Sequence, residues 1–149
     1  MMPKCLRVAA LSLVLLIAGA AAPFAAQDAA KPAPDRVVYH VNDSESQAIR
    51  AMQYISNHLE VNPRAEIVVV THAGGVDFLM RGAKTRNGNP YSDPLEELLL
   101  RGVRFEVCEI TLRERQMTRQ QFIGEVTFVP SGVAEIARLQ HEGYAYIKP

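Results

Sequence analysis

Cysteine is the residue of this sequence best suited to chemistry, because its thiolate is a strong nucleophile. The chain has two cysteines, Cys5 and Cys108. Cys5 lies in an N-terminal segment that we expect to be removed, so Cys108 remains as a single thiol without a partner for an internal disulfide. A lone thiol in an exported protein is either reactive or a small buried hydrophobe, and its surroundings decide between the two.

Cys108 falls near the end of a predicted strand, three residues before Thr111. Thr111 begins the pattern Thr-Leu-Arg-Glu, which predicts a helix N-terminus with Thr111 as its cap. The dipole and the free N–H groups of a helix N-terminus stabilise a thiolate. Arg113 and Arg115 would support the thiolate further, whereas the adjacent Glu109 opposes it by charge. We therefore predict that Cys108 is a reactive, catalytic thiol.

A second predicted helix N-terminus follows Pro130. Ser131 does not lie in the G-x-S-x-G pattern of hydrolases, so we interpret it as a helix cap. The N–H groups at Ser131 and Gly132 are suited to an anion such as a sulfur oxyanion or a carboxylate. Thr111, Ser131 and Gly132 are accordingly the candidate binding residues.

The histidines do not show the spacing of a metal site. No pair is separated by two or four residues and no second cysteine remains to help, so we predict no bound metal. We interpret His40 as a hydrogen-bonded core residue of a covered sheet, and His72, at a strand end, as a possible partner for Cys108. The four histidines are His40, His58, His72 and His141.

Strand and helix patterns alternate along the chain and would position these residues. Helical patterns start near residues 44, 93, 111 and 132, and a short helix is expected within 73–82. The first pattern opens with the capping box Ser44-Glu-Ser-Gln47, and the second ends at Gly102. This alternation predicts an α/β fold with an open, mainly parallel five-stranded sheet and helices on both faces, three layers in all. In such sheets the functional crevice lies at the carboxyl ends of the strands, where Cys108 and Ser131 fall. The predicted strands are 36–41, 65–71, 103–110, 125–129 and 144–147.

The N-terminal region has the organisation of an export signal. Residues 1–26 contain two basic residues followed by an uncharged apolar run, residues 8–22, that is shorter than the roughly 20 residues of a membrane-spanning helix. We predict a cleaved signal peptide over 1–26, a flexible lead-in over 27–35 and a single domain over 36–149. The mature protein is then periplasmic or secreted, with no membrane segment.

Charge and aromatic content exclude some classes of function. All 16 acidic residues follow Ala26, whereas two of the 16 basic residues, Lys4 and Arg7, precede it. The mature domain is therefore slightly acidic, which argues against a nucleic-acid binder or a polybasic membrane-surface protein. The absence of Trp argues against a base-stacking platform.

Three segments in order resemble a known family. Gly102-Val-Arg-Phe-Glu-Val-Cys108, followed by Thr111-Leu112, is the central one; Tyr39-His-Val-Asn-Asp43 precedes it and the stretch 130–147 follows it. Together they resemble the DsrE/DsrF-like (DsrEFH) family, in particular its exported branch. The resemblance implies a parallel five-stranded α/β fold, commonly assembled as a homotrimer or homohexamer. In the sulfur-relay members, the cysteine matching Cys108 carries a persulfide that is passed between proteins.

Two functions from different classes remain open. The first is a sulfur carrier or sulfurtransferase-like protein that acts through Cys108 without a cofactor and meets a sulfur donor or acceptor protein. The second is a non-enzymatic, oligomeric module of the same fold that binds a small ligand or a protein. The position of the thiol favours the first function. Export, the missing second thiol and Glu109 favour the second.

Overall fold

A computed structural model of the chain describes residues 34–149. The predicted signal peptide and nearly all of the predicted lead-in lie outside the described residues. Within them, no helix has the length and apolar character needed to cross a membrane.

Five parallel strands form one sheet in the order β4-β3-β2-β1-β5. The strands are β1 (Arg36–Asp43), β2 (Glu66–Gly74), β3 (Arg104–Cys108), β4 (Thr127–Val129) and β5 (Ala145–Ile147). The helices are α1 (Ser44–Val61), α2 (Ser92–Leu100), α3 (Glu109–Glu114) and α4 (Gly132–His141), with 3₁₀ turns at Asp77–Leu79 and Arg119–Gln121. The predicted α/β class, with its parallel five-stranded sheet, is confirmed.

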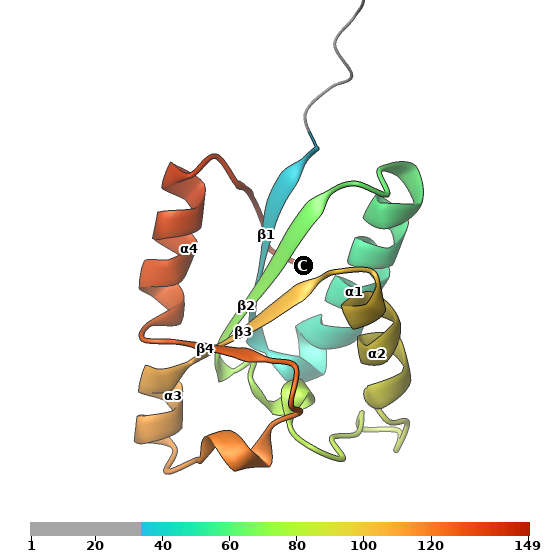
Figure 1. Ribbon diagram of the computed structural model, residues 1–149. Helices are drawn as coiled ribbons and strands as arrows, with labels where there is room; N and C mark the ends of the chain where they lie inside the picture. Colours follow the sequence, from blue (N-terminus) through green and yellow to red (C-terminus); the bar gives the residue numbers. More distant parts are fainter. Residues whose placement is uncertain (1–33) are drawn as a thin grey trace, which may run out of the picture. The chain divides into compact units, whose positions relative to one another are not determined.

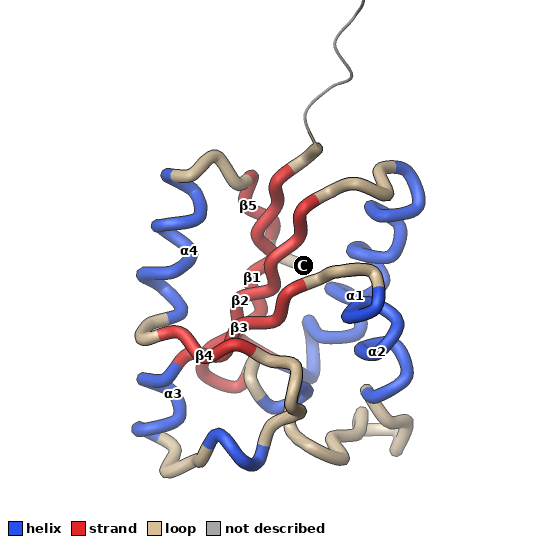
Figure 2. Tube along the Cα trace, in the orientation of Figure 1, coloured by secondary structure: helices blue, strands red, loops and turns tan. Residues whose placement is uncertain are grey.

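The sheet is covered on both faces (Figures 1 and 2). Figure 2 shows α1 and α2 on one side of the sheet and α4 on the other, where α4 packs against β1, β2 and β3. The α1 and α2 side holds the larger hydrophobic core, and the α4 side holds a smaller core. In Figure 1, α4 follows directly from the carboxyl end of β4 and runs back along the sheet. The chain therefore forms three layers, as the alternation of its patterns predicted.

The central strand β2 explains why four β-branched residues stand in a row. Ile67 and Val69 pack into the larger core, and Val68 and Val70 pack into the smaller core. All four are at most 3% exposed. Because side chains alternate along a strand, a strand buried on both faces needs apolar residues at every position.

Some local boundaries differ from the prediction. The N-cap of α1 is Asp43, which accepts the N–H groups of Glu45 and Ser46, so the predicted capping box at Ser44 is wrong. The Ser44 hydroxyl instead donates to the Gly74 carbonyl at 2.7 Å and accepts the N–H of Phe78 at 3.1 Å. A long-range contact therefore occupies the hydroxyl that the local pattern assigned to a cap.

The segment after β2 is also less helical than predicted. Instead of a short helix within 73–82, β2 continues to Gly74 and only the turn Asp77–Leu79 is helical. At Gly75 the chain lies so close to β1 that a Cβ would be 2.1 Å from the carbonyl oxygen of Val41. Only glycine permits this approach, and the packing against β1 prevails over the local helical pattern.

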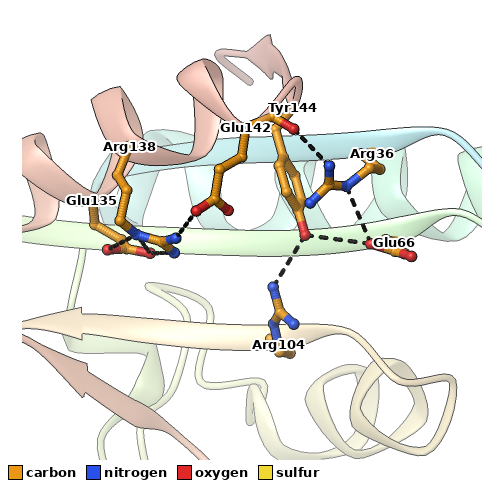
Figure 3. A network of polar contacts seen from close by, with 7 residues as sticks. All are labelled: Arg36, Glu66, Arg104, Glu135, Arg138, Glu142 and Tyr144. Carbon is orange, nitrogen blue, oxygen red and sulfur yellow. Dashed lines mark hydrogen bonds and ion pairs between the residues drawn. The ribbon is translucent and has the colours of Figure 1, made fainter.

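Polar contacts anchor α4 and the chain that follows it (Figure 3). Arg138 pairs with Glu135 and Glu142 along the helix. The Tyr144 hydroxyl accepts from Arg104 at 3.3 Å and donates to Glu66 at 3.4 Å, so it links the end of α4 to β2 and β3. Surface ion pairs add little stability individually, and those of Arg138 lie within α4 and its C-cap, so the contacts of Tyr144 are the ones that tie this end of the helix to the sheet.

Candidate functional site

Three neighbouring strands place Cys108, His72 and His40 on the α4 face at the carboxyl end of the sheet. Val38 and Val68 face α4 in the smaller core, and His40 and His72 lie an even number of residues further along β1 and β2. Phe105 of β3 faces the opposite core, and Cys108, three residues on, faces α4. The parallel register brings these three side chains side by side.

Four hydrogen-bond donors lie around the sulfur of Cys108 and favour its thiolate form. They are the backbone N–H groups of Ile110, Thr111 and Gly132 and the hydroxyl of Thr111. Burial by itself raises the pKa of the Cys108 thiol, but these donors outweigh burial and the pKa is lowered overall. Three of the four donors belong to the first turn of α3 and one to the first residue of α4, so two helix N-termini converge on the sulfur.

The helix after β3 begins earlier than predicted. The strand ends at Cys108 rather than at residue 110, and Cys108 itself is the N-cap of α3, so the prediction that Thr111 is the cap is wrong. Thr111 lies in the first turn, where its hydroxyl also accepts the N–H of Ala73 at 2.9 Å. The effect on the thiol has the predicted direction, but the sulfur sits closer to the helix than the sequence indicated.

Gly132 contacts Cys108 at the start of α4, and Ser131 precedes it as the cap of that helix. Ser131 caps α4 by accepting the N–H of Ala134 at 3.4 Å, which confirms its interpretation as a helix cap. A Cβ on Gly132 would lie 3.2 Å from the Cβ of Cys108 and 3.3 Å from the Cβ of His72. The absence of a side chain at Gly132 therefore lets α4 approach both residues.

The charges around the thiol are arranged differently from the prediction. Glu109 pairs with Arg119, which offsets the negative charge expected to oppose a thiolate. Arg115, expected to support the thiolate, donates to the Ala73 carbonyl at 3.0 Å and pairs with Asp77 at 2.7 Å. Backbone N–H groups and the Thr111 hydroxyl, rather than the guanidinium group of Arg115, thus favour the thiolate of Cys108.

His40 links His72 to the surface. Its Nε2 lies 2.7 Å from Nε2 of His72, and its Nδ1 lies 2.7 Å from the hydroxyl oxygen of Tyr146 on β5. Burial, Lys148 and His72 lower the pKa of His40 to about 4, and burial and Lys148 lower the pKa of His72. Both imidazoles are therefore neutral at pH 7. The prediction that His40 is hydrogen-bonded is confirmed, although it is half-buried rather than part of the core.

Glu106 is a site residue that the sequence analysis missed. It precedes Cys108 by two residues on the same face and is 7% exposed. Burial and the charge of Glu135 raise the pKa of Glu106 to about 7. Its Oε2 has no hydrogen-bond partner among the described residues. A charged residue inside the run Phe-Glu-Val was the available signal.

Cys108 is enclosed in the single chain. The residue is 4% exposed and its thiol is free. Within residues 34–149, no group of three or more histidine, cysteine, aspartate or glutamate side chains is arranged to hold a metal ion. The chemistry that this arrangement supports is therefore that of a polarised, hydrogen-bonded thiol beside a neutral histidine pair.

The family model of the DsrE/DsrF-like family matches residues 36–149, the whole described domain from β1 onward. The chain belongs to the DsrE/DsrF-like family. The family is linked to sulfur relay, and its members are often oligomeric. The match thereby confirms the family to which the three sequence segments pointed.

Two solved structures are similar to this DsrE-like domain. Protein MTH1491 from Methanobacterium thermoautotrophicum, described as a protein of unknown function, is 35% identical with a TM-score of 0.69. The ychN protein from E. coli is 15% identical with a TM-score of 0.65, a similarity of fold alone. In both cases the match covers 77% of this chain and 99% of the other. A comparison with curated proteins found no match.

Proposed function

We propose that this DsrE-like protein is an exported sulfur carrier, sulfurtransferase-like in its chemistry, which holds sulfane sulfur as a persulfide on Cys108. The observation that carries the proposal is the convergence of four hydrogen-bond donors on the Cys108 sulfur. Donors of this kind stabilise both the attacking thiolate and the anionic persulfide that follows. The link of the family to sulfur relay supports the same chemistry.

The transfer step needs only a persulfide donor. The Cys108 thiolate attacks the terminal sulfur of a donor persulfide R–S–SH and forms a new S–S bond. The S–S bond within the donor breaks, and the donor sulfur leaves with the electron pair as R–S⁻. The products are the Cys108 persulfide and, after protonation, the donor thiol R–SH. The reverse step on an acceptor thiol would discharge the carrier, and neither step consumes an outside oxidant.

We also propose that the protein acts as a homo-oligomer, a trimer or a hexamer. The support is that members of the family are often oligomeric. Light scattering on the purified protein should give the mass of several protomers. A monomer at micromolar concentration would contradict this part of the proposal.

The enclosure of Cys108 favours a second candidate function. A residue that is 4% exposed can be packing rather than chemistry, and the protein would then be an oligomeric module that binds a small ligand or a partner protein. The two functions differ in one property, namely whether the native thiol reacts.

Intact-mass analysis separates the two functions. The protein expressed from its full gene is incubated at neutral pH with a small-molecule persulfide donor, and separately with iodoacetamide. The carrier gains the mass of one sulfur atom or one alkyl group in its native state, Cys108→Ser gains neither, and the control Cys5→Ser behaves as the wild type does. A Cys108 that reacts only after unfolding would rule out the carrier and leave the binding module.

A further inference from the structure

His72 lies next to Cys108, on the neighbouring strand and on the same face of the sheet. His72 and Cys108 share contact with the same residue, since a Cβ on Gly132 would lie within 3.3 Å of the Cβ atoms of both. They occupy neighbouring strands, where Thr71 pairs with Val107 one residue earlier. The next pair along the register therefore brings His72 alongside the thiol on the α4 face.

His72 is also the inner end of a hydrogen-bonded chain. The His72 and His40 Nε2 atoms are 2.7 Å apart, so one nitrogen carries the proton and the other accepts it. At its other nitrogen, His40 is 2.7 Å from the hydroxyl of Tyr146, a residue that is 42% exposed. The series of hydrogen bonds thus runs from His72, next to Cys108, to Tyr146 at the protein surface.

One arrangement of protons makes His72 a base. When the His72 Nε2–H donates to His40 and the His40 Nδ1–H donates to the Tyr146 oxygen, Nδ1 of His72 carries no proton. A neutral imidazole with a bare nitrogen can accept a proton directly or through one water molecule. Both imidazoles are neutral at pH 7 because burial and Lys148 disfavour their cations.

We propose that His72 accepts the proton of the Cys108 thiol and returns it to the departing donor thiolate, while His40 and Tyr146 hold His72 in the required tautomer. This inference rests on the proposed sulfur transfer. The thiol S–H bond breaks first and leaves the thiolate that forms the new S–S bond, and the proton on His72 then converts R–S⁻ into R–SH. His40 and Tyr146 are positioning residues, since they act only through His72.

The charged groups around the hydrogen-bonded side chains His72, His40 and Tyr146 determine how the rate of sulfur loading depends on pH. Lys148, which follows β5 and donates to Asn42, acts on both imidazoles and, together with burial, lowers the pKa of His72. Arg115, the residue after α3, donates to the Ala73 carbonyl and is paired with Asp77. On β3, Glu106 lies two residues from Cys108 on the same face, and burial and Glu135 raise its pKa to about 7. On α4, Glu135 is the first charged residue, and it pairs with Arg138. Loading should therefore slow as the pH falls and His72 becomes protonated.

The rate at which Cys108 gains sulfur from a small-molecule persulfide donor tests the inference. For His72→Ala we expect about a hundredfold slower rate at pH 7, at the low end of what a general base contributes, and partial recovery on addition of imidazole. The variant should also lose the slowing at low pH that belongs to His72. Tyr146→Phe, which removes one surface hydroxyl, should give a smaller loss, and the exposed His141→Ala should match the wild type.

The outcomes distinguish this inference from the proposed function. A wild type that does not load sulfur would refute the proposed function itself. A wild type that loads, with His72→Ala equally fast or slow without recovery by imidazole, would refute the proton transfer alone. If His72→Ala does not fold, the Tyr146→Phe variant decides, and an unchanged rate and pH profile there would overturn the inference.

Discussion

Thr111 acts on two groups with one hydroxyl. The hydroxyl donates to the Cys108 sulfur, and its oxygen accepts the N–H of Ala73 at 2.9 Å. It therefore couples the state of the thiol to the end of β2, where His72 precedes Ala73. Because Thr111 is only 3% exposed, water does not easily replace either hydrogen bond of its hydroxyl.

Thr111→Val should separate these two effects from the shape of the side chain, since valine has nearly the same volume. We expect the pKa of Cys108 to rise, because one donor to the thiolate is lost. We also expect the free energy of unfolding to fall by about 1–3 kcal/mol, because the Ala73 N–H loses its acceptor. The pH dependence of native alkylation and urea unfolding measure the two effects.

The matched control is Thr127→Val in β4, a threonine that is exposed. It should change neither the alkylation profile nor the urea midpoint. An unaltered Cys108 profile in Thr111→Val would show that the hydroxyl does not stabilise the thiolate.

At the scale of elements, the N-terminus of α4 determines the surroundings of the Cys108 sulfur. The first residue of this helix donates to Cys108, and its missing side chain allows the helix to seat against β2 and β3. The contacts of Tyr144 with Arg104 and Glu66 hold the other end of the helix to the sheet (Figure 3). The position of one helix along the sheet therefore sets the polarity around the thiol.

Gly132→Ala should displace this helix. The new Cβ would meet the Cβ atoms of Cys108 and His72 and the Thr71 carbonyl oxygen at 3.2–3.3 Å, and none of these is the end of a flexible side chain. We expect a loss of about 1–3 kcal/mol in the free energy of unfolding, as for other overpacked sites, and a higher Cys108 pKa as the N–H moves away. Thermal unfolding and native alkylation at several pH values measure both.

Gly124→Ala is the appropriate control, because a Cβ at Gly124 would meet nothing within 4 Å. That variant should be as stable and as reactive as the wild type. Equal stability of Gly132→Ala and Gly124→Ala would mean that α4 is not held tightly at this end.

For the whole molecule, the buried Glu106 makes stability depend on pH. The pKa of Glu106 is raised to about 7 in the folded protein, first by burial and then by Glu135, whereas an unfolded glutamate has a pKa of about 4.3. The folded state therefore binds the proton more tightly. The stability that protonation of Glu106 contributes is fully present below pH 4.3 and is lost as the pH rises through 7.

Glu106→Gln removes this loss. We expect the variant to match the wild type near pH 4 and to be more stable above pH 7, by on the order of 3 kcal/mol. Urea unfolding at a series of pH values gives the difference. The exposed Glu96→Gln in α2 is the control, and it should follow the wild type. A constant difference between Glu106→Gln and the wild type across this range would contradict the raised pKa.

Export is a prediction for the whole chain that rests on residues 1–26. The apolar run over 8–22 is too short to anchor the protein, so the mature chain should begin between Ala22 and Ala30. N-terminal sequencing of the protein from a periplasmic fraction tests this. Intact Met1 recovered with the membranes would show that the segment is not removed.

The sequence by itself determined the elements and their order. Ser131 as a cap, the buried run Ile67–Val70 and the break at Gly102, whose φ is +83°, are visible locally because capping, side-chain alternation and left-handed turns each involve only a few neighbouring residues. The single thiol at a strand end could be identified for the same reason. These local rules fixed the class of the fold and pointed to Cys108.

Only the tertiary structure decided what surrounds the thiol. The pairing of His40 with His72, the N–H of Gly132 on the sulfur and the burial of Glu106 join residues that are far apart in the chain. Each depends on strand order and on the seat of α4, which are set by packing across the sheet. Local patterns carry no information on that packing. For the same reason they predicted Thr111 as the N-cap of α3, where the structure has Cys108.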